Sequence, residues 1–214
     1  MNILVLVSGG GTNLQALIDA ERAGRFTEKT NNVTDRIAAV VSDRSGAYAL
    51  ERAQAAGIPA LTEEPDRRLS KIEREEKLSE RILGIARHYQ ADLIILAGFL
   101  SILRGTIIQE YEGWIINLHP SLLPKYGGPG MYGARVHEAV LAAGEKESGC
   151  TVHLVDEGTD TGPVLLQRKV PVLPEDTAAS LAERIHREEH TAIVEAVLLM
   201  LNRFRYSSTQ QRGK

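Results

Sequence analysis

The chain has 214 residues, of which 25% are charged, and its formal net charge is −3. This length is enough for one large or two small domains with a substantial core, and we favour a single domain. Because the charge is nearly balanced, no long-range field draws the chain to nucleic acid or to an anionic membrane.

The single cysteine, Cys150, excludes an internal disulfide and a cysteine-based zinc cluster. We expect it to be a small buried side chain. The apolar run at residues 1–7 is too short to span a bilayer, and no positively charged segment precedes it. The sequence therefore predicts a soluble, cytoplasmic protein that binds neither membrane nor nucleic acid.

Strands and helices alternate through the first half of the chain. Apolar segments predict strands at residues 1–7, 37–42 and 92–97, with a short extended segment at 58–61. One-sided apolar patterns predict helices at residues 13–23, 48–56 and 69–89. This alternation predicts an α/β fold, a three-layer sandwich in which a mostly parallel twisted sheet has helices on both faces and a Rossmann-like N-terminal half. Ligands of such folds bind at the carboxyl ends of the strands.

The second half begins with an apolar strand at residues 114–119, which two prolines end. A glycine-rich stretch at 127–133 is expected to form a mobile loop, and a short helix follows at 136–143. Residues 149–155 and 164–172 then predict an antiparallel strand pair. Thr177 is expected to cap a last helix that runs to about Phe204, before a polar tail at 206–214.

A glycine-rich loop, residues 8–13, joins the first strand to a helix. Backbone N–H groups converge at such a helix start, which favours a phosphate site over a simple tight turn. No Lys-Ser or Lys-Thr pair follows, which argues against a nucleotide triphosphatase. Leu14 replaces the third glycine of a dinucleotide fingerprint, yet Asp43 follows the second strand as a ribose-binding acid would. A Rossmann oxidoreductase therefore stays open as an alternative.

Polar residues gather at the end of the strand at 114–119. Because side chains alternate along a strand, Asn117 and His119 are expected on the same face. The topology adds His153 from another strand and Asp160 from the loop after it. An imidazole exchanges protons near neutral pH, and an amide both donates and accepts hydrogen bonds. Together these residues favour acyl or carbonyl chemistry.

Other polar residues receive no role in the chemistry. Ser121 lacks the Gly-x-Ser-x-Gly elbow of a serine nucleophile, which disfavours an acyl-enzyme. His137 is expected on a partly exposed face of its short helix, within reach of a substrate, but a structural role is favoured. His88, His186 and His190 lack metal-ligand spacing to a cysteine or carboxylate cluster, so no metal is expected.

Several motifs carry a resemblance that spans nearly the whole chain. They lie at residues 7–15, 96–99, 116–126 and 151–167, and the third contains Asn117-Leu118-His119-Pro120-Ser121-Leu122-Leu123-Pro124. In these segments the chain resembles the glycinamide ribonucleotide formyltransferases, purine-synthesis enzymes that use 10-formyltetrahydrofolate. The third motif also occurs in other formyltetrahydrofolate-dependent enzymes. Chain length and the glycine loop are what favour the glycinamide ribonucleotide enzymes over these other enzymes.

The resemblance implies a catalytic trio, Asn117, His119 and Asp160, with His153 in a supporting role. Asn117 is expected to donate a hydrogen bond to the oxyanion that develops when the glycinamide amine attacks the formyl carbon. His119, when protonated, is expected to assist it and to move protons. Asp160 is expected to raise the pKa of His119 and to order the water through which the amine loses its proton.

Two substrate pockets are implied as well. The ribonucleotide is expected at Gly11, Thr12, Asn13 and Glu189, and the folate at Arg74, Leu100, Ser101, Ile102, Leu103, Asn117, Val155 and Asp156. An exposed acid on the last helix is the other interpretation of Glu189. Arg74 matches a folate-side arginine only with a one-residue gap, and Glu75 takes its place otherwise. Many relatives have Met-Arg at the position of Leu100-Ser101, so one cationic contact to the cosubstrate is missing.

The resemblance further implies one formyltransferase domain over residues 1–205, with a phosphate-binding half at 1–100, a folate-binding and catalytic half at 101–205 and a polar tail at 206–214. The implied partners are small-molecule substrates, with 10-formyltetrahydrofolate as cosubstrate and no metal, for a monomer or homodimer. Formyl transfer to another amine, such as an amino sugar, and a non-catalytic nucleotide-binding module are the alternatives.

Overall fold

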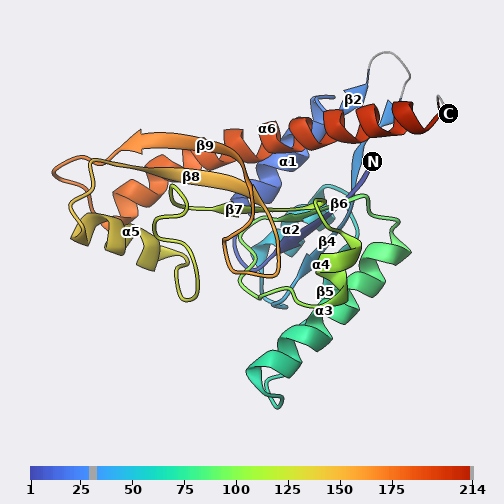
Figure 1. Ribbon diagram of the computed structural model, residues 1–214, viewed down its shortest axis with the longest axis horizontal. Helices are drawn as coiled ribbons and strands as arrows, with labels where there is room; N and C mark the ends of the chain where they lie inside the picture. Colours follow the sequence, from blue (N-terminus) through green and yellow to red (C-terminus); the bar gives the residue numbers. More distant parts are fainter. Residues whose placement is uncertain (29–32, 213–214) are drawn as a thin grey trace.

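The computed structural model describes residues 1–28 and 33–212 (Figure 1). Its main sheet has seven strands: β1 (Asn2–Val7), β4 (Arg36–Ser42), β5 (Ala60–Thr62), β6 (Leu93–Leu96), β7 (Ile115–His119), β8 (Glu147–Leu154) and β9 (Val164–Pro171). Their order is β5-β4-β1-β6-β7-β8-β9. The first five run parallel, whereas β8 lies antiparallel to both β7 and β9. The predicted mostly parallel sheet with an antiparallel pair near its C-terminal end is confirmed.

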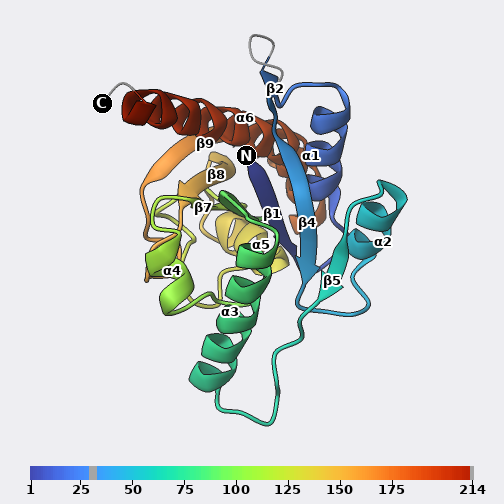
Figure 2. The same cartoon turned by 90° about the vertical axis from the view of Figure 1, so that its right-hand side faces the viewer.

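Helices cover both faces of this sheet: α1 (Thr12–Arg22), α2 (Tyr48–Ala55), α3 (Lys71–His88), α4 (Thr106–Glu110), α5 (Ala134–Ala142) and α6 (Ala178–Arg212). Alternation along β1 divides the core in two. Leu4 and Leu6 pack with α3 and α4, whereas Ile3, Val5 and Val7 pack with α1, α5 and α6. Figure 2 shows α3 and α4 on one side of the sheet and α1 and α6 on the other. The three-layer sandwich is therefore confirmed.

Two features were missed by the sequence patterns. The strands β2 (Thr27–Glu28) and β3 (Val33–Thr34) form a separate antiparallel pair, and α4 is a single short helix. Elements of two to five residues are too short to show a periodic pattern. The expectation for Cys150 is confirmed, because its side chain is fully buried beside α6.

The last helix begins as expected and ends later. Thr177 caps α6, because its hydroxyl accepts a hydrogen bond from the backbone N–H of Ser180 at 3.1 Å. The backbone stays helical to Arg212, beyond the predicted end near Phe204 and through most of the predicted polar tail. Residues 205–212 contain no glycine or proline, so nothing in their composition stops a helix.

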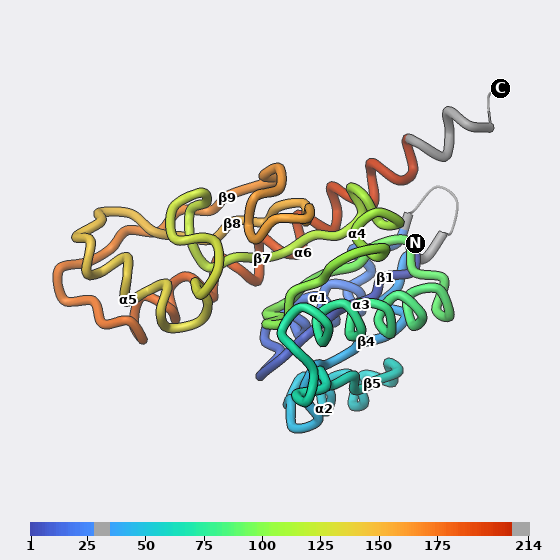
Figure 3. Tube along the Cα trace, turned by 60° about the horizontal axis from the view of Figure 1, so that its bottom comes forward, coloured from blue at the N-terminus to red at the C-terminus, as the bar shows by residue number. Residues whose placement is uncertain are grey.

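The order of the strands locates the ligand crevice. From β1 the chain adds β4 and β5 on one side, and then returns to add β6 and β7 on the other side. The border between β1 and β6 is therefore the topological switch point of the sheet. The loops after these two strands meet there, since the Leu100 N–H donates to the Ser8 hydroxyl at 2.8 Å. Figure 3 shows β8, β9 and α5 to one side of the parallel half, and α6 extends from that side toward the parallel half.

Candidate active site

Three polar side chains meet at the carboxyl end of β7. Asn117 and His119 lie two residues apart on this strand, and both contact Asp160, which follows β8. One Asp160 oxygen, Oδ1, accepts from Asn117 Nδ2 at 3.4 Å, and Oδ2 lies 3.4 Å from His119 Nδ1. The structure thus brings together the three residues that the sequence grouped, with Asp160 between the amide and the imidazole.

His153 fixes the orientation of the Asn117 amide. The His153 Nδ1 lies 2.8 Å from the Leu154 carbonyl oxygen, which can only accept, so this nitrogen carries the proton. The opposite nitrogen, Nε2, then accepts from Asn117 Nδ2 at 3.1 Å. Antiparallel pairing of β7 with β8 sets Asn117 directly opposite His153, which explains the contact.

His119 is held in a defined tautomer as well. Its Nε2 donates to the Tyr126 carbonyl oxygen at 2.8 Å, which leaves Nδ1 facing Asp160. Burial lowers the pKa of His119 below its usual value, although the charge of Asp160 and the bond to Tyr126 act in the opposite direction. Asp160 thus acts on this pKa in the expected direction, but the net shift is downward. Desolvation of a side chain that is only 4% exposed outweighs the attraction of the carboxylate.

Asp160 is an ionised carboxylate in a strained backbone position. Burial alone raises its pKa, but the nearby His153 and His119 rings and the N–H of Gly128 bring the pKa below the usual value. The Gly128 N–H donates to Oδ2 at 2.9 Å and so ties the glycine-rich loop to this side chain. With φ at 58°, Asp160 has a left-handed backbone that is uncommon outside glycine and frequent at functional sites.

The glycine loop after β1 leads directly into α1. Gly11 has φ at 71°, and a Cβ atom there would lie 2.6 Å from that of Ala49, so only glycine fits. Thr12 begins the helix, and Asn13 Nδ2 donates to Glu189 Oε2 at 3.2 Å. Glu189 is 5% exposed and burial raises its pKa, so the interpretation as an exposed acid is wrong. Asn13 and Glu189, both predicted for the ribonucleotide, lie together.

The predicted folate residues line the loop after β6 and the loop after β8. Leu100 is exposed and Leu103 is buried, with Ser101 and Ile102 of intermediate exposure. The Ser101 hydroxyl donates to Asp43 Oδ2 at 2.7 Å, so the buried Asp43 carboxylate faces the loop after β6. This contact weakens the interpretation of Asp43 as a ribose-binding acid.

The loop after β8 is shaped by its own side chains. The Val155 N–H bonds the Ile115 carbonyl, and Asp156 Oδ1 accepts from the Gly158 N–H at 3.0 Å and the Thr161 hydroxyl at 2.6 Å. These bonds place the backbone that precedes Asp160. An apolar slot with free backbone donors and acceptors is what a flat heterocycle such as a pterin requires.

Arg74 stands apart from the catalytic trio. It lies near the start of α3, and its side chain makes no hydrogen bond within the described part of the chain. The neighbouring Glu75 is 7% exposed and accepts from Arg104 Nε at 2.6 Å. Glu75 therefore connects α3 to the segment after Leu103, which is a structural role.

Sequence reasoning missed the histidines near Glu189. His137, expected on a partly exposed face, is only 3% exposed. It shares the buried face of α5 with Val136 and Val140, which pack toward α6. His186, Glu189 and His190 follow one another at helical spacing on α6, and the His186 Nε2 lies 3.9 Å from Glu189 Oε2. The i, i+3, i+4 spacing was the available signal for this group.

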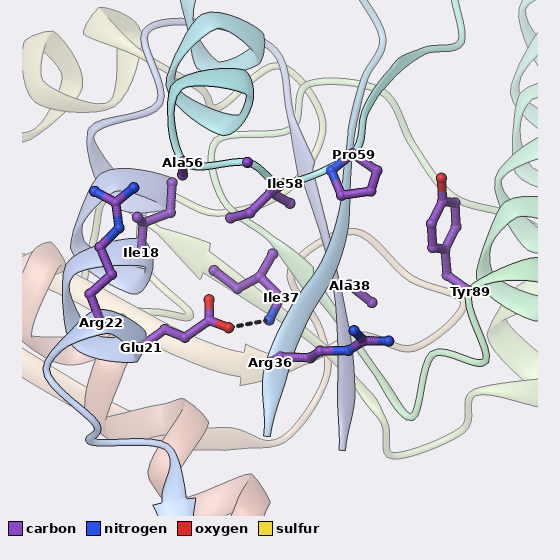
Figure 4. Close-up of a pocket in the computed structure, with 11 residues that line it drawn as sticks. Ile18, Glu21, Arg22, Arg36, Ile37, Ala38, Ala56, Ile58, Pro59 and Tyr89 are labelled. Atoms are coloured by element: carbon purple, nitrogen blue, oxygen red, sulfur yellow. Dashed lines mark hydrogen bonds between the residues drawn. The ribbon is translucent and has the colours of Figure 1, made fainter. Parts of the chain in front are cut away.

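A cavity of about 450 Å³ lies at the other end of the sheet (Figure 4). Arg36 begins β4 and Pro59 precedes β5, so this cavity is at the amino ends of the strands. Its wall is apolar at Ile18, Ile37 and Ile58, and the Glu21 carboxylate accepts from the Ile37 N–H. None of the predicted site residues lines it, so it is separate from Asn117, His119 and Asp160.

Within residues 1–28 and 33–212, no three or more His, Cys, Asp or Glu side chains are grouped so that they could hold a metal ion. No helix in that part of the chain has the length and apolar character needed to cross a membrane.

Comparison with known proteins identifies the family. The model of the formyl transferase family matches residues 1–197. The chain belongs to the formyl transferase family. Among curated proteins, this formyl transferase is 40% identical over 190 residues to phosphoribosylglycinamide formyltransferase of Escherichia coli strain K12, covering 89% of this chain and 82% of that one.

A longer relative and solved structures of similar proteins support the same family assignment. The trifunctional purine biosynthetic protein adenosine-3 of Drosophila melanogaster is 44% identical over 94% of this formyl transferase, which spans only 14% of that protein. The crystal structure of glycinamide ribonucleotide transformylase 1 from Symbiobacterium toebii superposes with a TM-score of 0.81 at 41% identity, covering 94% of this chain and 88% of that one. Phosphoribosylglycinamide formyltransferase from Brucella melitensis gives 0.78 at 40% identity, with coverage of 94% and 95%.

Proposed function

We propose that this protein transfers a formyl group from 10-formyltetrahydrofolate to the amine of glycinamide ribonucleotide, in purine biosynthesis. The products are formylglycinamide ribonucleotide and tetrahydrofolate, and one proton passes from the amine to the departing N10. The observation that carries the proposal is Asp160 set between Asn117 and His119 in a member of the formyl transferase family. Relatives named for this reaction support it.

Each member of the trio has a distinct part in this proposal. The Asn117 amide stabilises the oxyanion that forms on the formyl group, because His153 holds the amide in place with one N–H directed toward Asp160. Its contact with Asp160 is long, at 3.4 Å, and can be exchanged for the oxyanion. Asp160, ionised because its pKa is lowered, accepts the amine proton directly or through water. His119 assists proton movement toward N10.

The substrate pockets are assigned in the same way. The ribonucleotide phosphate binds the N–H groups of the glycine loop at Gly11, Thr12 and Asn13, where the helix dipole favours an anion. Glu189 accepts hydrogen bonds from the ribose hydroxyls. The folate binds between the loops that follow β6 and β8, and Leu100, which is 44% exposed, supplies apolar surface there.

The cosubstrate, the partners and the cell compartment belong to the same proposal. The cosubstrate is 10-formyltetrahydrofolate, the partners are small molecules and the chemistry described uses protein side chains with no metal ion. The cell compartment we propose is the cytoplasm. Ser101 in place of the arginine of many relatives predicts weaker electrostatic attraction of the folate, because one cation is missing from its pocket.

The assay follows the folate absorbance of purified protein with 10-formyltetrahydrofolate and glycinamide ribonucleotide. We expect turnover in the unmodified protein, and a loss of about 10²-fold or more in kcat for Asn117→Ala and for Asp160→Asn. Asn202→Ala on the exposed side of α6 is the matched control and keeps full activity.

Three outcomes contradict the proposal. Near-normal kcat in a folded Asn117→Ala protein removes Asn117 from the reaction. Binding of both ligands without product indicates a non-catalytic nucleotide-binding module. Formylation of an amino sugar phosphate in preference to glycinamide ribonucleotide indicates the related reaction on another amine.

A further inference from the structure

His137 is a buried histidine that the proposed reaction leaves without a role. Its side chain is 3% exposed, and its Nδ1 is fully buried with no hydrogen-bond partner among the described residues. Buried polar atoms in folded proteins nearly always have a partner, and an exception calls for an explanation. A partner supplied by a bound substrate is one such explanation.

The position of His137 favours a substrate partner. It lies on α5, which packs against α6, and it interacts electrostatically with both His119 of the trio and His186 of α6. His186 in turn lies 3.9 Å from Glu189. His137 is therefore near both the reaction centre and the end of the site where Glu189 and the glycine loop lie.

A second unpartnered atom points to the same place. Asn13 donates to Glu189 through Nδ2, yet its Oδ1 is also buried without a partner within the described part of the chain. Buried polar atoms without partners on both α1 and α5, two helices that pack against α6, are typical of a site that is completed by a polar ligand.

The ring is suited to an uncharged ligand group. Burial and the charges of His186 and His119 lower the pKa of His137 to about 4, so the imidazole is neutral at pH 7. A neutral imidazole presents one donor and one acceptor and carries no charge that would compete for the phosphate. Amide and hydroxyl groups match this pattern.

We propose that His137 binds the acceptor substrate, with Nδ1 hydrogen-bonded to the uncharged polar segment between its amine and its phosphate. This inference rests on the proposed function. With the amine at the trio and the phosphate at the glycine loop, that segment comprises the glycinamide amide and the ribose hydroxyls. His137 thus helps to select an acceptor with a polar linker of this length.

The test uses His137→Leu and His137→Asn in the full chain. Leucine fills similar space without polar atoms, whereas the asparagine carboxamide keeps a polar atom close to the position of Nδ1. Calorimetry measures the Kd for glycinamide ribonucleotide, and kinetics give KM for each substrate. His88→Leu, at an exposed position on α3, is the matched control.

We expect His137→Leu to raise the Kd and KM for the ribonucleotide by about 10-fold, the scale of one lost hydrogen bond, with KM for the folate changed less than about 2-fold. His137→Asn recovers most of the affinity. The Tm of the ligand-free leucine variant stays equal or rises, because an unpartnered buried polar atom has been removed.

Other results overturn the inference. Unchanged ribonucleotide affinity in His137→Leu, or a lower Tm of the free protein with unchanged affinity, assigns His137 a structural role. Should the leucine variant fail to fold, NMR of the unmodified protein decides: the Nδ1 resonance of His137 must shift on saturation with the ribonucleotide, whereas that of His88 must not. A protein that does not bind glycinamide ribonucleotide at all contradicts the proposed function, and the assignment of His137 with it.

Discussion

At the scale of single residues, burial and pairing compete to set the charge of the site, with burial dominant at His119 and pairing dominant at Asp160. His119 faces a carboxylate yet has a lowered pKa, because its ring is almost completely removed from water. Asp160 in the same cluster has a lowered pKa, because hydrogen bonds and nearby histidines stabilise its anion more than burial destabilises it. The free protein at neutral pH therefore combines a neutral imidazole with an ionised carboxylate.

The same effect predicts how stability depends on pH. The pKa of His137 is about 4 in the folded chain and 6.5 for an ordinary histidine, so between these values the unfolded chain binds a proton that the folded chain does not. Stability is therefore full above pH 6.5 and falls as pH drops toward 4. After solvent screening, we expect this histidine to contribute roughly 1–3 kcal/mol of the loss.

Urea unfolding at pH 7, 5.5 and 4.5 measures this contribution. The His137→Leu protein should lose less stability across this range than the unmodified protein does. Parallel pH curves for the two proteins would contradict the assigned pKa. Loss of stability at still lower pH belongs to Asp160, whose lowered pKa stabilises the fold only while the carboxylate is ionised.

At the scale of elements, short local signals set the ends of helices and the turns of the site. Ser70 and Glu73 form a reciprocal capping box at the start of α3, and Thr177 and Ser180 exchange two hydrogen bonds at the start of α6. Both helix starts were readable in the sequence. The later end of α6 was not, because a polar segment without glycine or proline is compatible with helix or coil.

The cap at Thr177 gives a direct test at this scale. Thr177→Ala removes the acceptor of the Ser180 N–H and should lower the free energy of unfolding by about 1 kcal/mol. Thr177→Ser keeps the hydroxyl and should retain most of the stability. Chemical denaturation of the three proteins compares them, and equal midpoints for alanine and threonine would show that the cap contributes nothing.

At the scale of the whole molecule, α6 connects the substrate site to the opposite end of the sheet. Near its start Glu189 bonds Asn13, and further along Arg205 donates to Asp35 at 2.5 Å. Asp35, 2% exposed, also accepts from the amino group of Met1. One buried carboxylate thus joins the beginning of β1, the residue before β4 and the C-terminal part of α6.

Removing this carboxylate should destabilise the entire fold. Asp35→Ala leaves two cations without their buried partner, and we expect a loss of about 3 kcal/mol in the free energy of unfolding. The KM for both substrates should stay unchanged, because Asp35 is remote from the trio. Asp66→Ala removes an exposed pair with Arg68 and serves as control. Equal stability of the two variants would show that the buried network is unimportant.

Much of the architecture was accessible from the sequence. Apolar segments of the sequence predicted the strands of the parallel sheet and the antiparallel pair. One-sided apolar patterns predicted the helices that cover both faces of the sheet. Strand alternation placed Asn117 and His119 on one face, and Asp160 joined them because the loop after β8 lies at the end of β7 where those side chains project. The family motifs added the assignment of roles.

The sequence by itself determined the α/β class, the glycine loop and the residues of the trio, because these depend on local periodicity, turn chemistry and short motifs. Only the tertiary structure decided which side chains are buried from solvent. His137 was expected to be partly exposed, yet the packing of α5 on α6 buries it beside the site, and Glu189 is likewise buried against Asn13. Burial and pKa depend on what other elements bring to a residue, and a single helix pattern does not contain that information.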